Sequence, residues 1–306
     1  RVLMAETGQF ATLWRALADR LGLDVLFLAG DWRHGVQAEQ IAAALADDKG
    51  QLIKAVCCVH NETSTGVTSD IAAVRRAMDD TGHPALLMVD TISSLASIDY
   101  RHSEWGVDVT IGGSQKGLML PPGLSFNAVS EKALAAHEAG GMTRSYWDWS
   151  AMLGANKGGA FPYTPATNLL YGLDEAISML GEEGLQNVFQ RHARLAEATR
   201  RAVAAWGLET VAQVESEKSN SLTAVLLPEG HDADAFRSVV LQHFNMSLGN
   251  GLGRLAGRAF RIGHLGDFNE LMLAGTLSGV EMGLAAAGIP HSKGGVQAAL
   301  DFLSEI

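Results

Sequence analysis

The stretch Ile111-Gly112-Gly113-Ser114-Gln115-Lys116-Gly117 decides how this chain is organised. It continues a run of strand-forming residues that begins at Val107, so the sequence predicts a β-strand that ends in two glycines and then presents a lysine. In α/β proteins the ligand crevice lies at the carboxyl edge of the parallel sheet. A lysine that is partly shielded from water there loses its proton more easily and can attack a carbonyl carbon. Most lysines are simply solvated, so Lys116 alone does not specify a site.

A second predicted strand ends in a carboxylate. The apolar run 85–89 leads directly into Asp90. A lysine and an aspartate at neighbouring strand ends match the needs of pyridoxal phosphate (PLP), which requires a lysine for a Schiff base and an acidic partner for its pyridinium nitrogen. Lys116 and Asp90 are therefore the predicted catalytic residues of a PLP site.

A polar turn follows a third predicted strand. The segment His60-Asn61-Glu62-Thr63-Ser64-Thr65-Gly66 comes after an apolar run that ends at Val59. Hydroxyl and backbone N–H groups in such a turn can hold a phosphate or a phenolic oxygen. Turns rich in serine, threonine and glycine commonly bind nothing, so this one gains meaning only from Asp90 and Lys116 at the next strand ends.

The composition predicts a folded chain with a large core. Hydrophobic residues make up 47% of the 306 residues and charged residues 19%, which suits two domains or one large one. No apolar run approaches the roughly 20 residues that span a bilayer, and the first residues do not resemble a secretory signal. The formal net charge of -11 argues against nucleic acid and against anionic membrane surfaces as partners.

Cysteine and histidine usage favours a reducing compartment and no metal. Cys57 and Cys58 are adjacent within an apolar run, so on a strand they would point to opposite faces and would not form a disulfide. Buried free thiols suit a cytoplasmic protein. No HExxH or paired CxxC spacing occurs in the sequence, so we expect no metal site.

Strand and helix patterns alternate through the first half of the chain. Alternation at this spacing predicts βαβ units and a mainly parallel sheet that is covered by helices on both faces. The expected strands are 2–5, 23–28, 52–59, 85–89, 107–111 and 124–129, and the expected helices are 10–21, 36–45 and one that starts at a cap among 68–70 and runs to 78.

The second half of the chain has an α+β pattern. A long helix at 168–180 is expected to leave the first domain, and helix is expected to continue to about residue 205. We place the boundary near Tyr171, with a large domain at 1–170 and a smaller C-terminal domain at 171–306. The later elements are expected at 222–227 (strand), 232–244 (helix), 247–257 (Gly-rich), 270–287 (helix) and 295–303 (helix).

Two further features each have more than one interpretation. Arg261 is flanked by apolar residues, where an unpaired guanidinium would be costly. We therefore expect it to pair with a carboxylate, either inside the protein or on a substrate. An aromatic cluster is expected in the core or at a subunit interface; its members are Tyr146, Trp147, Trp149, Phe161 and Tyr163.

Together these motifs resemble the class V aminotransferases of PLP fold type I. The segments that carry the resemblance are HNETSTGVTSDI (60–71), LLMVDTISS (86–94), SQKGLMLPPGL (114–124), FPYTPATNLLYGL (161–173) and FRIGHLGDFN (260–269). The resemblance implies a large three-layer α/β/α domain with a mainly parallel sheet and a smaller C-terminal α+β domain. Members of the family begin with a segment that carries a Gly-rich turn for the phosphate, and we expect that segment to be missing here.

The resemblance also assigns roles to residues of the large domain. Lys116 should form the Schiff base with PLP, and Asp90 should bond the pyridine nitrogen. Thr63 should contact the ring hydroxyl or nearby polar atoms of the cofactor. Gln115 should lie near the phosphate.

Further roles follow from the same resemblance. Phe10 should stack on one face of the cofactor ring, and Ile92 should pack against the other. Arg261 should hold the α-carboxylate of the amino acid. Tyr163 and Thr164 should reach into the phosphate site of a neighbouring subunit, which implies a homodimer or homotetramer with shared active sites.

The resemblance is strongest to bacterial enzymes that transfer the amino group of L-serine to glyoxylate, giving hydroxypyruvate and glycine. Alanine or aspartate as the amino donor is the nearest alternative. A cysteine desulfurase would need an exposed nucleophilic cysteine, whereas Cys57 and Cys58 are predicted inside a strand. From another class, the chain could be a truncated, non-catalytic remnant; the expected missing segment favours this, and the Asp90, Lys116 and Arg261 set argues against it.

Overall fold

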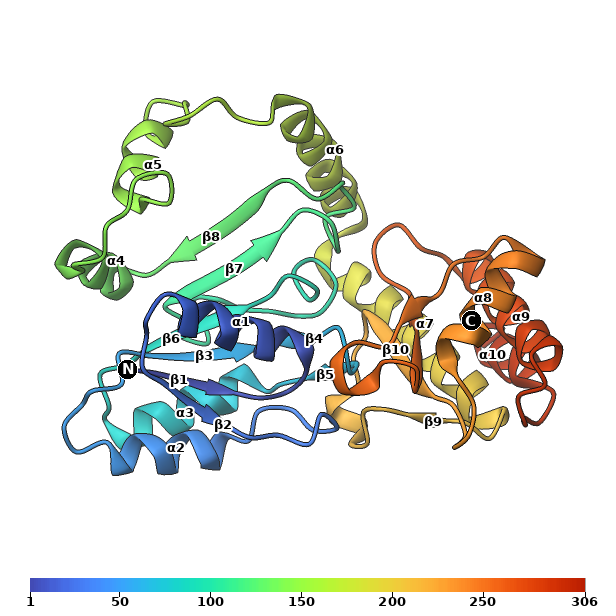
Figure 1. Ribbon diagram of the computed structural model, residues 1–306. Helices are drawn as coiled ribbons and strands as arrows, with labels where there is room; N and C mark the ends of the chain where they lie inside the picture. Colours follow the sequence, from blue (N-terminus) through green and yellow to red (C-terminus); the bar gives the residue numbers. More distant parts are fainter. Residues whose placement is uncertain (306) are drawn as a thin grey trace.

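The computed structural model describes residues 1–305 and shows two lobes (Figure 1). The first lobe is built on a six-stranded sheet and the second on a four-stranded sheet. The described part of the chain contains no helix with the length and apolar character needed to cross a membrane.

The six-stranded sheet is mainly parallel, as predicted. Its strand order is β2-β1-β3-β6-β7-β8, and every neighbouring pair is parallel except β7 and β8. The strands are β1 (Val2–Ala5), β2 (Val25–Leu28), β3 (Ala55–Val59), β6 (Leu86–Asp90), β7 (Val109–Gly113) and β8 (Ser125–Val129).

Helices cover both faces of the parallel strands. Met4 and Cys57 pack with residues of α1 on one face, while Leu3 and Cys58 pack with residues of α2 and α3 on the other. The adjacent cysteines therefore point to opposite faces, as predicted, and both are buried free thiols. The helices are α1 (Gln9–Arg20), α2 (Ala38–Asp47) and α3 (Ile71–Thr81).

The expectation of strands covered on both faces is wrong at β8. This edge strand is antiparallel to β7, and none of its residues is fully buried. Its polar residues Ser125 and Asn127 suit a strand with one solvated side. Two helices that the sequence analysis did not identify follow it; they are α4 (Glu131–Ala139) and α5 (Trp149–Asn156).

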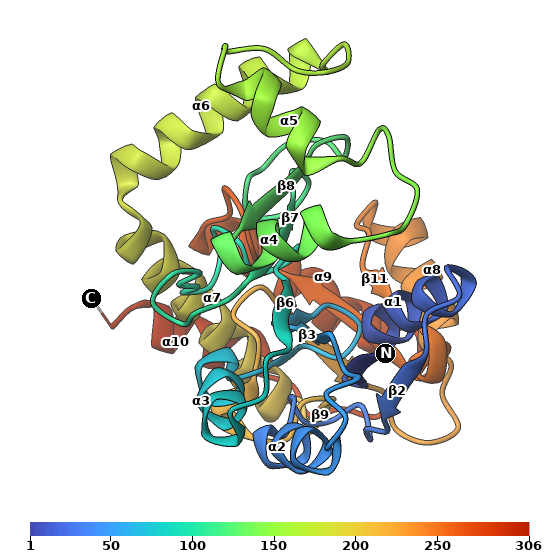
Figure 2. The same cartoon turned by 90° about the vertical axis from the view of Figure 1, so that its left-hand side faces the viewer.

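The aromatic cluster does not form a core within this chain. Four of its members are exposed, with Trp147 83% and Tyr146 58% accessible. The ring centroids of Tyr146 and Tyr163 lie 4.8 Å apart, so these two side chains contact each other without being covered. In Figure 2 the segment that joins α5 to α6 (Thr167–Glu183) projects beyond the sheet.

The second lobe is an antiparallel sheet packed against helices. Its strand order is β11-β12-β10-β9, and Trp206, Phe236 and Phe260 are its largest buried side chains. The predicted boundary near Tyr171 falls inside α6, so the division at that residue stays a prediction. The elements are α7 (Leu185–Ala205), β9 (Glu209–Thr210), β10 (Leu222–Leu226), α8 (Ala233–Phe244), β11 (Gly249–Asn250), β12 (Ala259–Gly263), α9 (Glu270–Ala286) and α10 (Gly295–Leu303).

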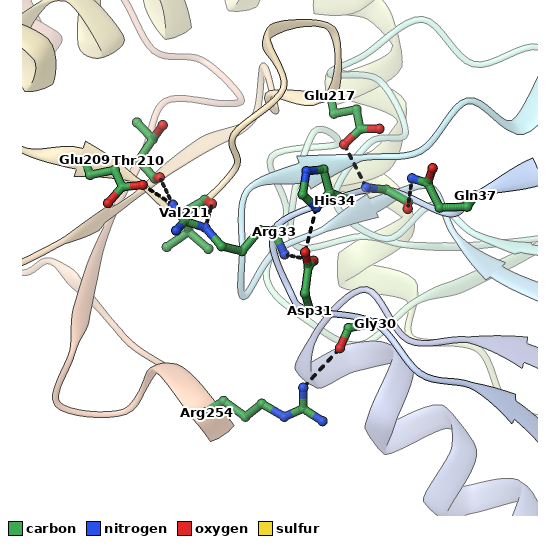
Figure 3. Close-up of polar contacts among 11 residues, drawn as sticks. Gly30, Asp31, Arg33, His34, Gln37, Glu209, Thr210, Val211, Glu217 and Arg254 are labelled. Atoms are coloured by element: carbon green, nitrogen blue, oxygen red, sulfur yellow. Dashed lines mark hydrogen bonds and ion pairs between the residues drawn. The ribbon is translucent and has the colours of Figure 1, made fainter.

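A loop that follows β2 holds the two lobes together (Figure 3). The Arg33 guanidinium forms an ion pair with Glu209 and donates to the carbonyl oxygen of Val211 at 2.9 Å. From the second lobe, Arg254 donates to the carbonyl oxygen of Gly30 at 3.1 Å. These contacts at the carboxyl end of β2 help to fix the position of the second lobe.

Candidate active site

Three neighbouring strands place polar groups at one edge of the sheet. In the register of the parallel pairs, Val59 of β3 lies beside Asp90 of β6, and Asp90 lies beside Ile111 of β7. A short hairpin of β4 (Asn61–Glu62) and β5 (Val67–Thr68) follows β3 at the same edge. The three strand ends that precede Thr63, run into Asp90 and lead to Lys116 are therefore adjacent in the sheet.

Asp90 is a partly buried carboxylate with one side-chain hydrogen bond. Its Oδ1 accepts from the backbone N–H of Ile92 at 2.8 Å, and no other side-chain bond to Asp90 occurs within residues 1–305. Burial raises the pKa of Asp90 to about 6, and the nearby charge of Glu62 acts in the same direction. Such a carboxylate can be stabilised by a cationic ligand, and the pyridinium nitrogen of PLP is one.

Lys116 is a half-buried amine with no hydrogen bond or ion pair from Nζ to any residue in the described range. Burial lowers the pKa of Lys116, and the positive charge of Arg261 lowers it further. The next residue, Gly117, allows a close approach, since a Cβ there would lie 2.2 Å from the carbonyl oxygen of Leu95. The amine is therefore partly desolvated and has a free lone pair available more often than an ordinary lysine.

Two predicted cofactor contacts, Ile92 and Gln115, meet over the end of β7. A Cβ on Gly113 would lie 2.8 Å from Gln115 Oε1 and 2.9 Å from Ile92 Cδ1. The glycine thus leaves the space that these two side chains occupy beside Lys116.

Thr63 lies in the same network. Its hydroxyl donates to Ser93 Oγ at 2.8 Å, and Ser93 in turn donates to the carbonyl oxygen of Asn61 at 2.8 Å. Thr63 Oγ1 keeps its lone pairs for another donor. The neighbouring hydroxyls of Ser64 and Thr65 are buried and bonded inside the protein, so only Thr63 of this turn is placed to meet a ligand.

Arg261 comes from β12 of the second lobe and reaches the hairpin of the first. Its Nη1 donates to the carbonyl oxygen of Thr63 at 2.9 Å, and its Nε donates to that of Asn250 at 2.8 Å. Of the two partners expected for Arg261, the internal carboxylate is wrong, because no ion pair of Arg261 occurs within residues 1–305. Two backbone carbonyl oxygens accept hydrogen bonds from the guanidinium instead. Its other N–H groups are not used by these bonds and could bind a carboxylate. The substrate carboxylate stays a prediction. Burial lowers the pKa of Arg261.

The remaining predicted residues differ in placement. Phe10 lies in the first turn of α1, and its backbone N–H bonds to the Glu62 carboxylate beside Asp90. Tyr163 and Thr164 lie on the exposed segment between α5 and α6. Within residues 1–305 the Tyr163 side chain contacts Tyr146 and Ser145, and it forms no hydrogen bond with the site.

Sequence reasoning missed Glu62. It is 0% exposed and stands at the centre of the polar turn. The available signal was a single acidic residue in a turn of histidine, asparagine, hydroxyl residues and glycine, next to a predicted buried strand. Within residues 1–305, no group of three or more histidine, cysteine, aspartate or glutamate side chains could hold a metal.

A cavity of about 790 Å³ lies elsewhere, between Arg33, β9 and the 228–231 loop of the second lobe. None of the predicted site residues lines it. It therefore contributes nothing to the assignment of the strand-end site.

The residues at the strand ends fit PLP by their chemistry. The site offers a partly desolvated amine, a partly buried carboxylate of raised pKa with one hydrogen bond, and a hydroxyl with free lone pairs. These are the groups that a Schiff base, a pyridinium nitrogen and a phenolic oxygen require.

Comparison with known proteins gives consistent matches over the whole chain. The family model described as Aminotransferase class-V matches residues 1–251. A serine–glyoxylate aminotransferase of Methylorubrum extorquens is 51% identical over 100% of this chain and 77% of its own length. An L-aspartate–glyoxylate aminotransferase of Paracoccus denitrificans is 45% identical over 98% of this chain and 76% of its own length. The crystal structure of ureidoglycine–glyoxylate aminotransferase from Bacillus subtilis has a TM-score of 0.90 and 30% identity, covering 99% of this chain and 78% of that chain.

Proposed function

Because the chain belongs to the class-V aminotransferase family, we propose that it binds PLP at the strand ends and transfers an amino group from L-serine to glyoxylate. The products would be hydroxypyruvate and glycine. The fold is that of the PLP-dependent aminotransferases of fold type I. The observation that carries the proposal is the convergence of Asp90, Lys116 and Arg261, each with polar atoms free for a ligand.

PLP, when bound, supplies an aldehyde that condenses with amines and a ring that accepts electrons from the substrate's Cα. Asp90 would hold a proton on the ring nitrogen, which keeps the ring electron-withdrawing. Lys116 Nζ, whose pKa is lowered by burial, would take the proton from Cα as a general base. Arg261 would bind the α-carboxylate through N–H groups not used on Thr63 and Asn250, and so orient the Cα–H bond.

The choice of L-serine as donor rests on the relatives. The relative named for serine is 51% identical to this chain, and the one named for aspartate is 45% identical. The desulfurase alternative lacks its nucleophile, because Cys57 and Cys58 are both buried in β3 and burial raises the pKa of Cys58 to about 12. The same two buried thiols support a cytoplasmic location within this proposal.

The proposal includes a homodimer, or a homotetramer built from it, with shared active sites. Tyr163 and Thr164 would reach the phosphate site of the second subunit. The support is the exposed aromatic surface around them, where Trp147 is 83% and Tyr171 78% accessible. Aromatic side chains of this kind are enriched at subunit interfaces.

The visible absorption spectrum tests the proposal. Purified protein with added PLP should show a visible band that disappears with L-serine and returns with glyoxylate. Steady-state rates with serine, alanine and aspartate as donors, each with glyoxylate, should then rank serine first. A protein that stays colourless with PLP would overturn the enzyme assignment in favour of a non-catalytic remnant, and a band that responds only to aspartate would overturn the donor.

A further inference from the structure

Glu62 is a fully buried carboxylate for which the proposed reaction has no step. It lies on β4, directly before Thr63, and is 0% exposed. Its oxygens accept from the backbone N–H of Phe10 at 3.2 Å, of Ala11 at 3.2 Å and of Ser64 at 3.1 Å, and from Ser64 Oγ at 2.7 Å. A buried carboxylate with this many donors has a specific structural task.

That task is to cap a helix that has no cap of its own. The residue before α1 is Gly8, which has no side chain to accept from the first turn. Glu62 takes the N–H groups of Phe10 and Ala11, and Ser64 Oγ takes that of Gln9 at 2.9 Å. A Cβ on Gly8 would lie 2.5 Å from Glu62 Cγ, so the glycine is what lets the carboxylate approach. The position of Phe10 therefore depends on a residue of the hairpin.

The same turn also touches the other parts of the site. Arg261 donates to the carbonyl oxygen of Thr63, and the Thr63 hydroxyl donates to Ser93 Oγ. Ser93 lies three residues after Asp90 along the chain. Moving Glu62 would therefore move Phe10 directly and would disturb two further contacts through Thr63.

Glu62 also acts through its charge. Burial raises the pKa of Glu62, whereas the N–H donors of Phe10, Ala11 and Ser64 around its oxygens favour the charged form. That charge in turn raises the pKa of Asp90. A second negative charge beside Asp90 makes a protonated ring nitrogen more favourable. We propose that Glu62 is a positioning residue of the cofactor site: it fixes the first turn of α1, and with it Phe10, and it strengthens the hold of Asp90 on the ring proton. This inference rests on the proposed function.

The test compares cofactor-free wild-type protein with Glu62→Gln and with Asp108→Asn as a matched control. Asp108 is 5% exposed and accepts from the Leu87 N–H at 2.9 Å and Ser130 Oγ at 2.8 Å, at the opposite edge of the same sheet. Each variant is titrated with PLP and with an analogue in which CH replaces the ring nitrogen. Amide hydrogen exchange of Phe10 and Ala11 is measured in the cofactor-free proteins.

Glu62→Gln should weaken PLP about tenfold and the analogue only about threefold, since the analogue reports the position of Phe10 without the ring proton. Exchange at Phe10 and Ala11 should accelerate at least about tenfold. Asp108→Asn should change both affinities and both exchange rates less than about twofold. Equal weakening of the two ligands would overturn the charge role, and unchanged affinity and exchange would overturn the inference while leaving the proposed function intact. Wild-type protein that binds no PLP would overturn both.

Discussion

The two edges of the six-stranded sheet hold carboxylates whose hydrogen bonding and pKa shifts are opposite. At the carboxyl edge Asp90 has one hydrogen bond, and burial raises its pKa to about 6. At the amino edge Asp48 accepts from the Ile53 N–H at 2.7 Å and pairs with His83, and these contacts, led by the backbone bond, lower its pKa. The fold thus satisfies the carboxylate of Asp48 with hydrogen bonds inside the protein and leaves that of Asp90, the proposed cofactor ligand, with one.

The largest effect is expected when the amine of Lys116, at the carboxyl edge of the sheet, is removed. Lys116→Ala should reduce kcat for serine–glyoxylate transamination by at least about 10⁴-fold, because it removes both the amine nucleophile and the general base. Lys132→Ala is the matched control. Its amine lies near the amino edge, where it donates to the Ala85 carbonyl oxygen at 2.8 Å, and kcat should stay within about twofold. Substantial turnover by Lys116→Ala in steady-state assays would contradict the placement of the active site at the carboxyl edge of the sheet.

Replacing Asp90 tests the difference between the two edges through the stability of the protein as well as through its activity. Its pKa is higher in the folded chain than in an unfolded one, so the folded state binds more protons between about pH 4 and 6 and loses stability as the pH rises through that window. Above pH 6 the cost is complete and amounts to at most about 3 kcal/mol. Asp90→Asn should therefore stabilise cofactor-free protein at pH 7.5 and have little effect at pH 4, while kcat falls about 10²- to 10³-fold.

Denaturant unfolding at the two pH values measures this difference. Asp108→Asn is the comparison from the amino edge, and it should have the opposite sign. Its carboxylate is satisfied by Leu87 and Ser130, so the variant should lose about 1–3 kcal/mol of the free energy of unfolding at pH 7.5. If both variants were destabilised by similar amounts, the two edges would not differ in the way proposed.

Much of the carboxyl edge could be predicted from sequence, because apolar runs that end in Asp90 or in Gly112-Gly113 mark where parallel strands stop. The direction of β8 could not, since an apolar pattern carries no information on strand direction. The exposure of the aromatic cluster could not be predicted from the sequence either. Whether Trp147 is covered depends on what lies beyond a single chain, and it is exposed in this one.

Two features of the site could not be predicted from the sequence for a different reason. Within the protein Arg261 bonds the carbonyl oxygens of Thr63 and Asn250, not the internal carboxylate that was one of its two expected partners. Backbone acceptors are the same at every position of a sequence, so no pattern marks these two. The cap of α1 was missed because Glu62 lies about 50 residues beyond the helix, whereas sequence rules look for caps directly before it. Hydrogen bonds between side chains and distant backbone groups are thus the part of this site that sequence patterns do not predict.

The smallest effect is expected from Arg33, which connects the carboxyl edge of the sheet to the second lobe. Arg33 follows β2 and holds Glu209 and the Val211 carbonyl, so it helps to set the distance from Arg261 to the first lobe. Arg33→Ala should raise the KM for L-serine about two- to fivefold with kcat nearly unchanged, because a partly exposed ion pair contributes up to about 1 kcal/mol. Arg76→Ala, which removes an exposed arginine of α3 that lies 4.0 Å from Asp70, is the control and should leave KM unchanged. An unchanged KM in Arg33→Ala would show that the second lobe keeps Arg261 in place without this loop, and the carboxyl edge would then serve the cofactor alone.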